Sequence, residues 1–310
     1  MSKRKLTTKD ISSHIPTGIS AGSLFIMGLK PDGRVVSTKI QDDPSYTWDR
    51  IDVGDWKDII AVSSGGYHTV GLKSDGTVVA VSDGGFGETA VSDWKDIVDV
   101  SAGYYHTVGL KSDGTVLSTS VTDPDLDHGQ TAVEDWKDII MVSAGEFHTV
   151  GLKSDGTVVA TPITKGIDHY QSSVEDWEDI IMISAAEKHT VGLKSDGTVV
   201  AEGDVGYGMC DVDDWEDIVA VSAGCRHTAG LKSDGTVVAI GKDLFDSDRP
   251  EIEDWEDIVV VDAGYDYTVG LKSDGSMIVA PFENDEYFQE ELIDYDEWKD
   301  IVNNGCAYIK

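Results

Sequence analysis

Residues 94–118 read WKDIVDVSAGYYHTVGLKSDGTVLS, and the two motifs of this stretch each occur seven times along the chain of 310 residues. Its hexapeptide GLKSDG, or GLKPDG in the first copy, begins at Gly28, Gly71, Gly109, Gly151, Gly192, Gly230 and Gly270. Its second motif is an acidic residue followed by Trp, by Lys or Glu, and then by Asp and Ile. The tryptophans of this motif are Trp56, Trp94, Trp136, Trp177, Trp215, Trp255 and Trp298. Repetition of one unit at intervals of about 40 residues is the signature of a repeat architecture.

Each unit has the composition of a small antiparallel sheet. DIVDVSAG is a β-branched run that ends in Gly, HTVGLK alternates, and KSDG is a tight-turn signal before a further strand, TVLS. The period of 3.6 residues expected of helical repeats is absent. Three or four short strands in about 40 residues are typical of a propeller blade, and propellers usually have four to eight blades. The sequence therefore predicts an all-β, seven-bladed propeller.

The units vary in length in only one half. The distance from each Trp to the next GLK glycine is always 15 residues, whereas the distance from that glycine to the next Trp ranges from 23 to 28. All insertions therefore fall in the loops between units, which span residues 37–54, 81–92, 119–134, 161–175, 202–213, 240–253 and 280–296.

The two ends of the chain complement each other. The first unit starts at Ile19 with Ser13 where its Trp should be, and the last unit has Trp298 but stops before another GLK. We expect the C-terminal strand to pair with the N-terminal unit in one blade, which closes the ring and leaves no open sheet edge. Residues 1–18 are then an N-terminal extension, and residues 19–310 form a single domain.

The repeat resembles the RCC1 (regulator of chromosome condensation) family, whose units carry Gly-x-x-His followed by a Leu-x-x-Asp-Gly turn. The matching residues run from Gly65, His68, Leu72, Asp75 and Gly76 to Gly224, His227, Leu231, Asp234 and Gly235. The resemblance covers about residues 19–310, is of the prokaryotic type, and extends in architecture to bacterial β-lactamase-inhibitor propellers. It implies a seven-bladed RCC1-like propeller.

The activities within this family differ from member to member. Its founding member is a guanine-nucleotide exchange factor that also binds chromatin, while other relatives are scaffolds or tight protein binders. Exchange depends on a wedge-like insertion, and no loop here exceeds the 23- to 28-residue half-units. Chromatin binding needs basic tails, of which MSKRK is only a fragment. Only the fold is carried over from the resemblance.

The charge is strongly acidic and concentrated in the loops. The 58 Asp and Glu against 24 Lys and Arg give −34, and the seven loops alone hold 28 acidic and 5 basic residues. Because affinity for phosphate comes from Lys and Arg, nucleic acid is excluded as a partner. Acidic residues mixed with aromatic ones instead suit a protein with a basic, partly apolar surface. The alternative is that these acids only maintain solubility.

A second variable position is the residue pair between SAG and the His position. The pairs are Ser23-Leu24, Gly66-Tyr67, Tyr104-Tyr105, Glu146-Phe147, Glu187-Lys188, Cys225-Arg226 and Tyr265-Asp266. At a strand-to-strand turn they would all lie at one mouth of the ring, and Tyr and Arg are common interface anchors. We predict that partner binding involves Tyr67, Tyr104, Tyr105, Glu146, Phe147, Lys188, Arg226, Tyr265, Asp266 and the loop residue Trp48. The alternative is drift in an exposed turn.

Two features raise the possibility of a metal site. Five histidines, His68, His106, His148, His189 and His227, share one repeat position, but residues on neighbouring blades should be too far apart for zinc at about 2.0 to 2.1 Å. We expect each to bond backbone within its own blade. Asp123, Asp125, Asp127 and Glu134 partly mimic a calcium loop, although His128 stands where that loop needs Gly. The repeat tryptophans should pack between blades.

These observations favour a non-enzymatic protein-binding propeller. No P-loop, GxSxG, HExxH or dinucleotide-binding pattern is present, so no cofactor is expected. A glycan- or small-ligand-binding propeller is the alternative, and an axial lyase or hydrolase site is a second one. Three separated cysteines and the lack of a signal-like or membrane-spanning stretch predict a cytoplasmic protein, which we expect to be a monomer that does not bind membranes.

Overall fold

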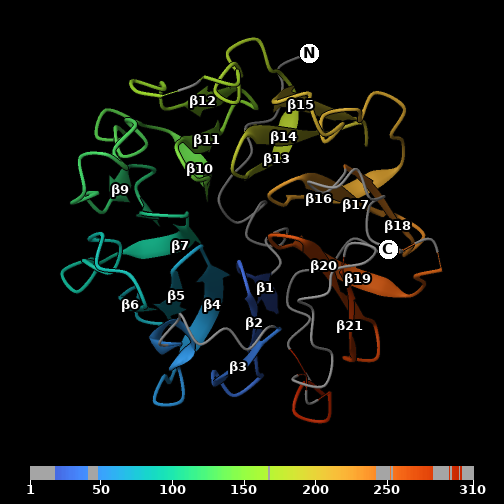
Figure 1. Ribbon diagram of the computed structural model, residues 1–310, viewed down its shortest axis with the longest axis horizontal. Coiled ribbons are helices and arrows are strands. Elements are labelled where there is room, and N and C mark those ends of the chain that lie inside the picture. Colours follow the sequence, from blue (N-terminus) through green and yellow to red (C-terminus); the bar gives the residue numbers. More distant parts are fainter. Residues whose placement is uncertain are drawn as a thin grey trace.

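A computed structural model describes residues 18–40, 48–166, 168–241, 252, 254–281, 293, 295–299 and 301. These residues form seven three-stranded antiparallel sheets arranged in a ring (Figure 1). We number these sheets as blades 1 to 7 in chain order. Within each blade the strands run inner, middle and outer along the chain, and the inner strands surround the axis of the ring (Figure 1).

The strands have nearly the same bounds relative to the repeat in every blade. They are β1 (Ile19–Ala21), β2 (Phe25–Leu29) and β3 (Val35–Lys39) in blade 1; β4 (Ile59–Ser64), β5 (His68–Lys73) and β6 (Val78–Ser82) in blade 2; β7 (Ile97–Ala102), β8 (Thr107–Lys111) and β9 (Val116–Ser118) in blade 3; β10 (Ile139–Ala144), β11 (Thr149–Lys153) and β12 (Val158–Ala160) in blade 4; β13 (Ile180–Ala185), β14 (His189–Lys194) and β15 (Val199–Gly203) in blade 5; β16 (Ile218–Ala223), β17 (His227–Lys232) and β18 (Val237–Gly241) in blade 6; and β19 (Ile258–Ala263), β20 (Tyr267–Lys272) and β21 (Met277–Pro281) in blade 7. One 3-10 helix, η1 (Asp49–Ile51), lies in the loop between blades 1 and 2. The predicted seven-bladed all-β fold is confirmed.

The aspartate of the Trp motif starts each inner strand from blade 2 onward. Asp58, Asp96, Asp138, Asp179, Asp217 and Asp257 all have φ between 59° and 62°. Asp adopts this left-handed region more readily than most residues because its short polar side chain can bond locally. The next residue then bonds across to the neighbouring blade, as Ile97 N–H does to the Gly76 carbonyl oxygen at 3.1 Å. The motif therefore joins blades as well as starting a strand.

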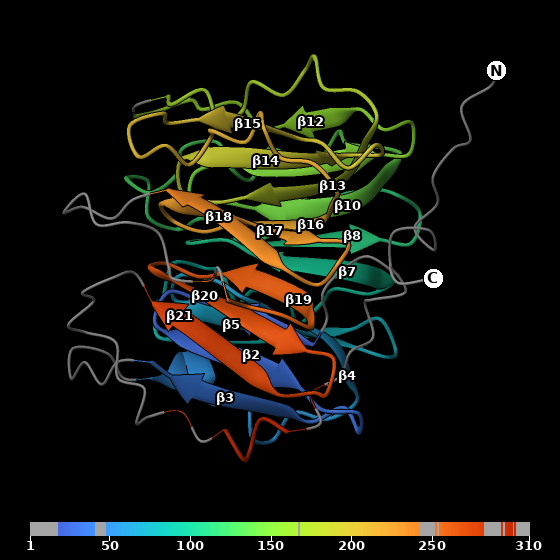
Figure 2. The ribbon, with the colours of Figure 1, turned by 90° about the vertical axis from the view of Figure 1, so that its right-hand side faces the viewer.

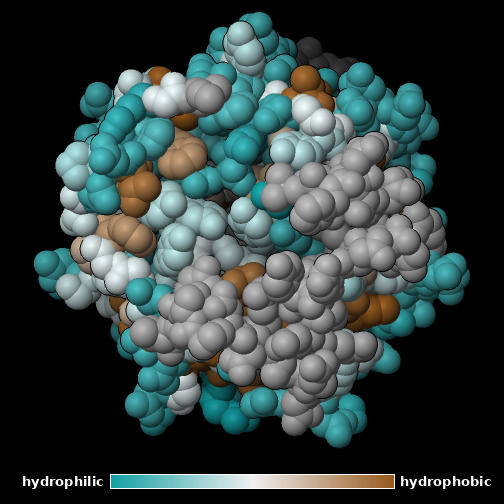
Figure 3. Space-filling model, in the orientation of Figure 1, coloured by the Kyte–Doolittle hydropathy of each residue, from teal (hydrophilic) through white to brown (hydrophobic). Residues whose placement is uncertain are grey.

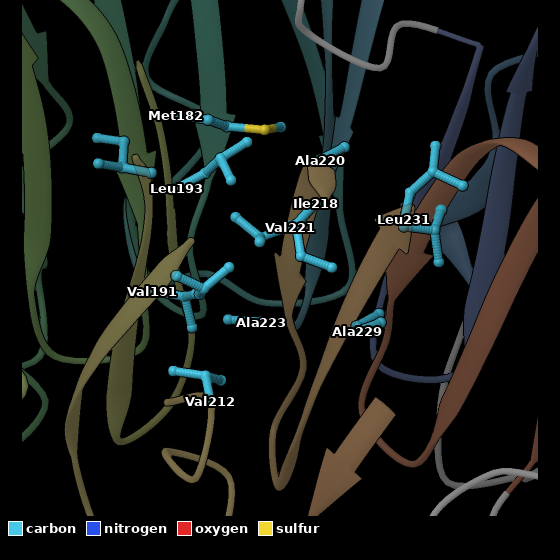
Figure 4. Close-up of a cluster of buried hydrophobic side chains, with 14 of the residues drawn as sticks. Met182, Val191, Leu193, Val212, Ile218, Ala220, Val221, Ala223, Ala229 and Leu231 are labelled. Carbon is cyan, nitrogen blue, oxygen red and sulfur yellow. The ribbon is translucent and has the colours of Figure 1, made fainter. Parts of the chain in front are cut away.

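The tryptophans pack between blades, as the sequence predicts. Trp94 belongs to a buried cluster that combines Val70 and Leu72 of blade 2 with Ile97 of blade 3. Its ring lies on Gly109 of the middle strand, where an added Cβ would come within 2.5 Å of the ring. The glycine of GLK is thus the platform for the tryptophan 15 residues earlier. Figure 4 shows the corresponding packing between blades 5 and 6, with Leu193 and Val221 among the buried side chains.

A ring of hydrogen bonds around the axis joins every blade to the next. The serine of each SAG segment accepts a backbone N–H from the following blade, as Ser101 Oγ does from Ala144 at 2.9 Å. The bonds are Ser64 to Ser20, Ala102 to Ser63, Ala144 to Ser101, Ala185 to Ser143, Ala223 to Ser184, Ala263 to Ser222 and Ala21 to Asp262, at 2.8 to 2.9 Å. In blade 7 aspartate replaces serine, and its longer side chain makes the bond that returns to blade 1.

The C-terminal Trp motif completes blade 1. An added Cβ on Gly28 would meet Trp298 and Ile301, just as one on Gly71 would meet Trp56 and Ile59. Lys30 donates hydrogen bonds to the carbonyl oxygens of Glu297 and Lys299. The C-terminal motif thus supplies the part that the N-terminal unit lacks. The predicted strand after Ile301 lies outside the described residues.

The repeated histidines join neighbouring blades, which corrects the expectation of a backbone bond within one blade. Their Nε2 atoms lie 2.7 to 2.9 Å from threonine hydroxyls of the following blade; the pairs are His68–Thr107, His106–Thr149, His148–Thr190, His189–Thr228 and His227–Thr268. Thr190 in turn donates its only hydroxyl proton to the Gln171 carbonyl oxygen. His148 Nε2 must therefore be the donor. Because burial lowers the pKa of His148 to about 3, the ring is the neutral Nε2–H tautomer at pH 7.

Candidate functional site

The seven turn pairs lie at one end of the ring because of the strand directions. Inner strands end there, middle strands begin there, and antiparallel pairing returns the outer strands to the same end, as the Tyr267–Pro281 register shows. In Figure 2 the arrowheads of the outer strands β3, β18 and β21 point to the left, toward this end of the ring. Backbone bonds between neighbouring blades fix the turns, including Tyr104 N–H to the Gly145 carbonyl oxygen at 3.1 Å. We call this end the turn face.

Blades 2 to 4 carry a continuous aromatic group on the turn face. It consists of Tyr67, Phe86, Tyr104, Tyr105, Phe147 and His128, all partly exposed. Tyr105 is its centre, with ring centroids 5.8 Å from Tyr67, 5.3 Å from Phe86, 5.0 Å from Tyr104 and 6.1 Å from Phe147. His128 extends the group, 4.1 Å from Phe147. Figure 3, which looks onto the turn face, shows brown and white patches over blades 3 and 4 on a mainly hydrophilic surface.

Blades 5 to 7 carry a charged group on the same face. It consists of Glu187, Lys188, Cys225, Arg226, Tyr265 and Asp266. Lys188 pairs with Glu187 at 3.1 Å, and the Cys225 thiol donates to the second oxygen of that carboxylate. Arg226 pairs with Asp266 at 3.0 Å and lies over the Tyr265 ring, 5.2 Å from its centroid. These charges are largely paired within the group.

The two groups meet at a hollow on the axis of the ring. The hollow has a volume of about 450 Å³, including the open space at its mouth, and each blade contributes Ala or Ser and then Gly or Ala to its wall. The larger side chains on its wall are Tyr104, Glu146, Glu187, Cys225 and Tyr265. Burial, and secondarily the charge of Glu187, raises the pKa of the Glu146 carboxyl to about 8.

Trp48 lies beside this arrangement and is partly buried. Its ring packs on two cations, with the Arg50 guanidinium 4.9 Å and the Lys39 ammonium 5.2 Å from its centroid. Arg50 is buried, pairs with Asp83 at 3.1 Å and donates to the Gly66 carbonyl oxygen, next to Tyr67. Trp48 is therefore tied to the edge of the aromatic group through Arg50.

The structure thus brings together the residues singled out from the repeat pattern. The Tyr105 ring contacts those of Tyr67 and Phe147, and Arg226 lies in the charged group on the same face. Sequence reasoning did not assign Phe86 and His128 to the site, because both lie in loops of variable length. The sequence did contain a clue to both: each is an aromatic residue in the loop that follows an outer strand, and outer strands end at the turn face.

The calcium-like loop is organised by other contacts. Asp123 Oδ1 accepts the Asp125 N–H at 2.9 Å, and Asp127 Oδ1 accepts the Gly129 N–H at 3.1 Å. Lys165 Nζ pairs with Asp125 at 2.9 Å. These carboxylates serve as turn caps, and within the described part of the chain no three His, Cys, Asp or Glu side chains cluster as metal ligands would. The calcium site stays a prediction.

Within the described residues, no helix has the length and apolar character needed to cross a bilayer.

Comparisons with known proteins agree with this architecture. The Regulator of chromosome condensation (RCC1) repeat family matches residues 59–88 and 97–120. No curated protein matches the sequence. Among solved structures, the CRINKLY WD40 ectodomain of the Arabidopsis thaliana receptor kinase ACR4 is 21% identical, with a TM-score of 0.68 over 89% of this chain and 96% of that one.

Two further structures show the same fold. Prp20p of Saccharomyces cerevisiae, studied for its binding to Gsp1p and histones, is 16% identical, with a TM-score of 0.62 over 90% of this chain and 85% of that one. Human WBSCR16 is 15% identical, with a TM-score of 0.60 over 86% of this chain and 87% of that one. The resemblance to β-lactamase-inhibitor propellers stays a prediction. The repeat match in blades 2 and 3 and the ring of seven three-stranded blades show RCC1-like repeats and the fold of an RCC1-like propeller.

Proposed function

We propose that this protein is a non-enzymatic protein-binding propeller that uses its turn face. The observation that carries the proposal is the aromatic group of blades 2 to 4, in which Tyr67, Tyr105 and Phe147 form a run of partly exposed rings. Aromatic rings supply large contact areas with little conformational entropy to lose, and they are enriched at interface centres.

The difference between blades supports a single large partner. A site for a small repeated ligand would place the same residues in every blade, whereas the turn pairs differ in all seven. The framework beneath them is constant, so the variation is confined to the surface. One partner spanning the face would contact the aromatic group on one side and the charged group on the other.

The acidic loops supply a long-range electrostatic attraction for the partner. Outer strands end at the turn face, so the loops with 28 acidic and 5 basic residues leave from its rim. Such a field attracts a basic surface and speeds its association. The proposed partner is therefore a protein with a basic, partly apolar surface rather than nucleic acid or membrane.

The relatives bear on this proposal only by analogy. Prp20p was studied with Gsp1p and histones, and in another structure yeast RCC1 (Prp20) is bound to Kap60. Protein binding is thus a use to which this fold is put. We propose that residues 19–310 of this chain act likewise, as one monomeric domain in the cytoplasm, where the free thiols of Cys210 and Cys225 would be stable.

The proposal is tested by quantitative capture of partners from a lysate of the native host. The bait variants are Tyr105→Ala with Phe147→Ala, and a control with Ile60→Ala and Val98→Ala. Ile60 and Val98 are also exposed apolar side chains, but they lie near the start of inner strands, away from the turn face. We expect the first pair to abolish capture of proteins that the wild type and the control both retain. Equal capture by all three baits would refute the proposal.

A further inference from the structure

The wall of the axial hollow is made of small residues at its depth and of long polar side chains at its mouth. Its depth is built from Ala, Ser and Gly of the inner strands, whereas four long side chains surround the mouth: Tyr104, Glu146, Glu187 and Tyr265. The two tyrosines come from blades 3 and 7. Both line the hollow, and burial raises the pKa of Tyr104.

The Glu146 carboxyl group has no hydrogen-bond or ion-pair partner among the described residues. The backbone N–H of this residue bonds the Ala186 carbonyl oxygen. Glu187 already holds Lys188 and the Cys225 thiol. Two carboxyl groups therefore share a narrow, partly desolvated space with one lysine. The cost of ionising both raises the pKa of Glu146, and a second cation between them would favour the ionised form of Glu146.

Tyr265, which lines the hollow, already contacts a cation of this chain. The Arg226 guanidinium lies over the Tyr265 ring at 5.2 Å from its centroid and is within 3.4 Å of the Tyr265 hydroxyl oxygen. Aromatic faces attract cations, and more strongly when both are removed from water. Tyr104 offers a second ring of the same kind beside Glu146.

We propose that the axial hollow receives one lysine side chain of the protein partner, with its ammonium group between the carboxylates of Glu146 and Glu187. This inference rests on the proposed function, because the hollow opens on the turn face. Lysine fits better than arginine because its compact ammonium can lie between two carboxyl groups at the mouth and needs no planar slot. It matches the basic surface proposed for the partner.

The probe for this test is Nα-acetyl-lysine methylamide, titrated into the full chain and followed by NMR. Nα,Nε-diacetyl-lysine methylamide has nearly the same shape without the charge, and Nα-acetyl-arginine methylamide keeps the charge on a wider group. We expect binding of the lysine probe, none of the diacetyl probe and weaker binding of the arginine probe. Binding of the diacetyl probe as strong as that of lysine, or tighter binding of arginine, would overturn the inference.

Two variants with the same charge change locate the site. Glu146→Gln should weaken lysine binding about tenfold or more, since one charge-assisted hydrogen bond is lost. Glu178→Gln removes an exposed carboxylate from the Trp motif of blade 5, outside the hollow, and should leave the affinity unchanged. Equal affinities of the two variants would place the probe elsewhere and overturn the inference.

The outcome separates this inference from the proposed function. If capture depends on Tyr105 and Phe147 but the lysine probe does not bind, the protein-binding function stands and the lysine receptor is wrong. If the probe binds as expected while capture ignores Tyr105 and Phe147, the receptor stands and the aromatic group is not the partner's landing surface.

Discussion

The contacts between neighbouring blades, which we call the seams, differ from the turn face in how their polar groups are used. At the seams one arrangement recurs: a histidine donates to a threonine of the next blade, and a serine accepts a backbone N–H. On the turn face no two blades present the same pair, and the side chains partner each other differently in each half. The seams specify the ring, while the turn face is free to specify a partner.

The two seams without histidine show how strictly this frame is kept. In blade 7 Tyr267 replaces histidine, and its hydroxyl reaches the Gly22 and Phe25 carbonyl oxygens of blade 1. Between blades 1 and 2 Phe25 takes the position, and the Arg50 guanidinium lies over its ring at 5.2 Å. Different chemistry fills the same space, so the requirement at a seam is a filled and bonded contact between blades rather than histidine itself.

The largest expected effect is acid sensitivity of the seams. Burial lowers the pKa of His68, His106, His148 and His189 to about 3, against an ordinary value of 6.5. Below pH 6.5 the unfolded chain therefore binds protons that the folded chain does not, and stability falls with pH. Each histidine should cost roughly 2 kcal/mol between pH 7 and pH 5. Burial raises the pKa of Asp99 to about 7 and that of Glu146 to about 8, and both shifts offset part of this loss.

Denaturant unfolding at pH 7, 6 and 5 measures this effect. We expect the free energy of unfolding to drop by several kcal/mol over that range. His148→Gln keeps a donor for Thr190 but cannot be protonated, so its stability should depend less on pH. His128→Gln, at the aromatic group, is the matched control and should retain the wild-type dependence. Stability that stays constant from pH 7 to 5 would show that the seam histidines are not buried as neutral rings.

A smaller loss is expected from Thr190→Val. The hydroxyl of Thr190 serves His148 and the Gln171 carbonyl oxygen, so the variant leaves two buried groups without a partner, at a cost of about 2 to 4 kcal/mol. Thr157→Val is the matched control, because that hydroxyl bonds Asp155 in an exposed turn and should cost less than about 1 kcal/mol. Chemical denaturation compares them, and equal losses would contradict the buried relay.

The repeat pattern was sufficient to predict the blades, because it carries strand periodicity, turn chemistry and a constant spacing of 15 residues. It also placed the turn pairs at one end, since strand direction follows from antiparallel pairing. The partner of His148 could not be predicted in the same way, because a contact between blades depends on how two copies pack. Phe86 and His128 were missed for a related reason: loops of unequal length carry no register from which to place a side chain.

The smallest expected effect is on the turn face itself. Asp266→Asn breaks a partly exposed ion pair with Arg226, and such pairs contribute about 0.2 to 1 kcal/mol to stability. Thermal unfolding should therefore show almost no change. A loss as large as that of Thr190→Val would mean that the charged group belongs to the frame of the ring rather than to a surface free to vary.

The most direct test of the account is site-specific photo-crosslinking in the native host, with p-benzoyl-phenylalanine in place of Tyr105 or, in a second strain, of Ile60. Both positions are in blade 2 or 3 and accessible to solvent, but only Tyr105 lies on the turn face. The account predicts a discrete crosslinked protein from position 105 that is absent from position 60. A product from position 60 alone, or none from position 105, would contradict the claim that the turn face binds the partner.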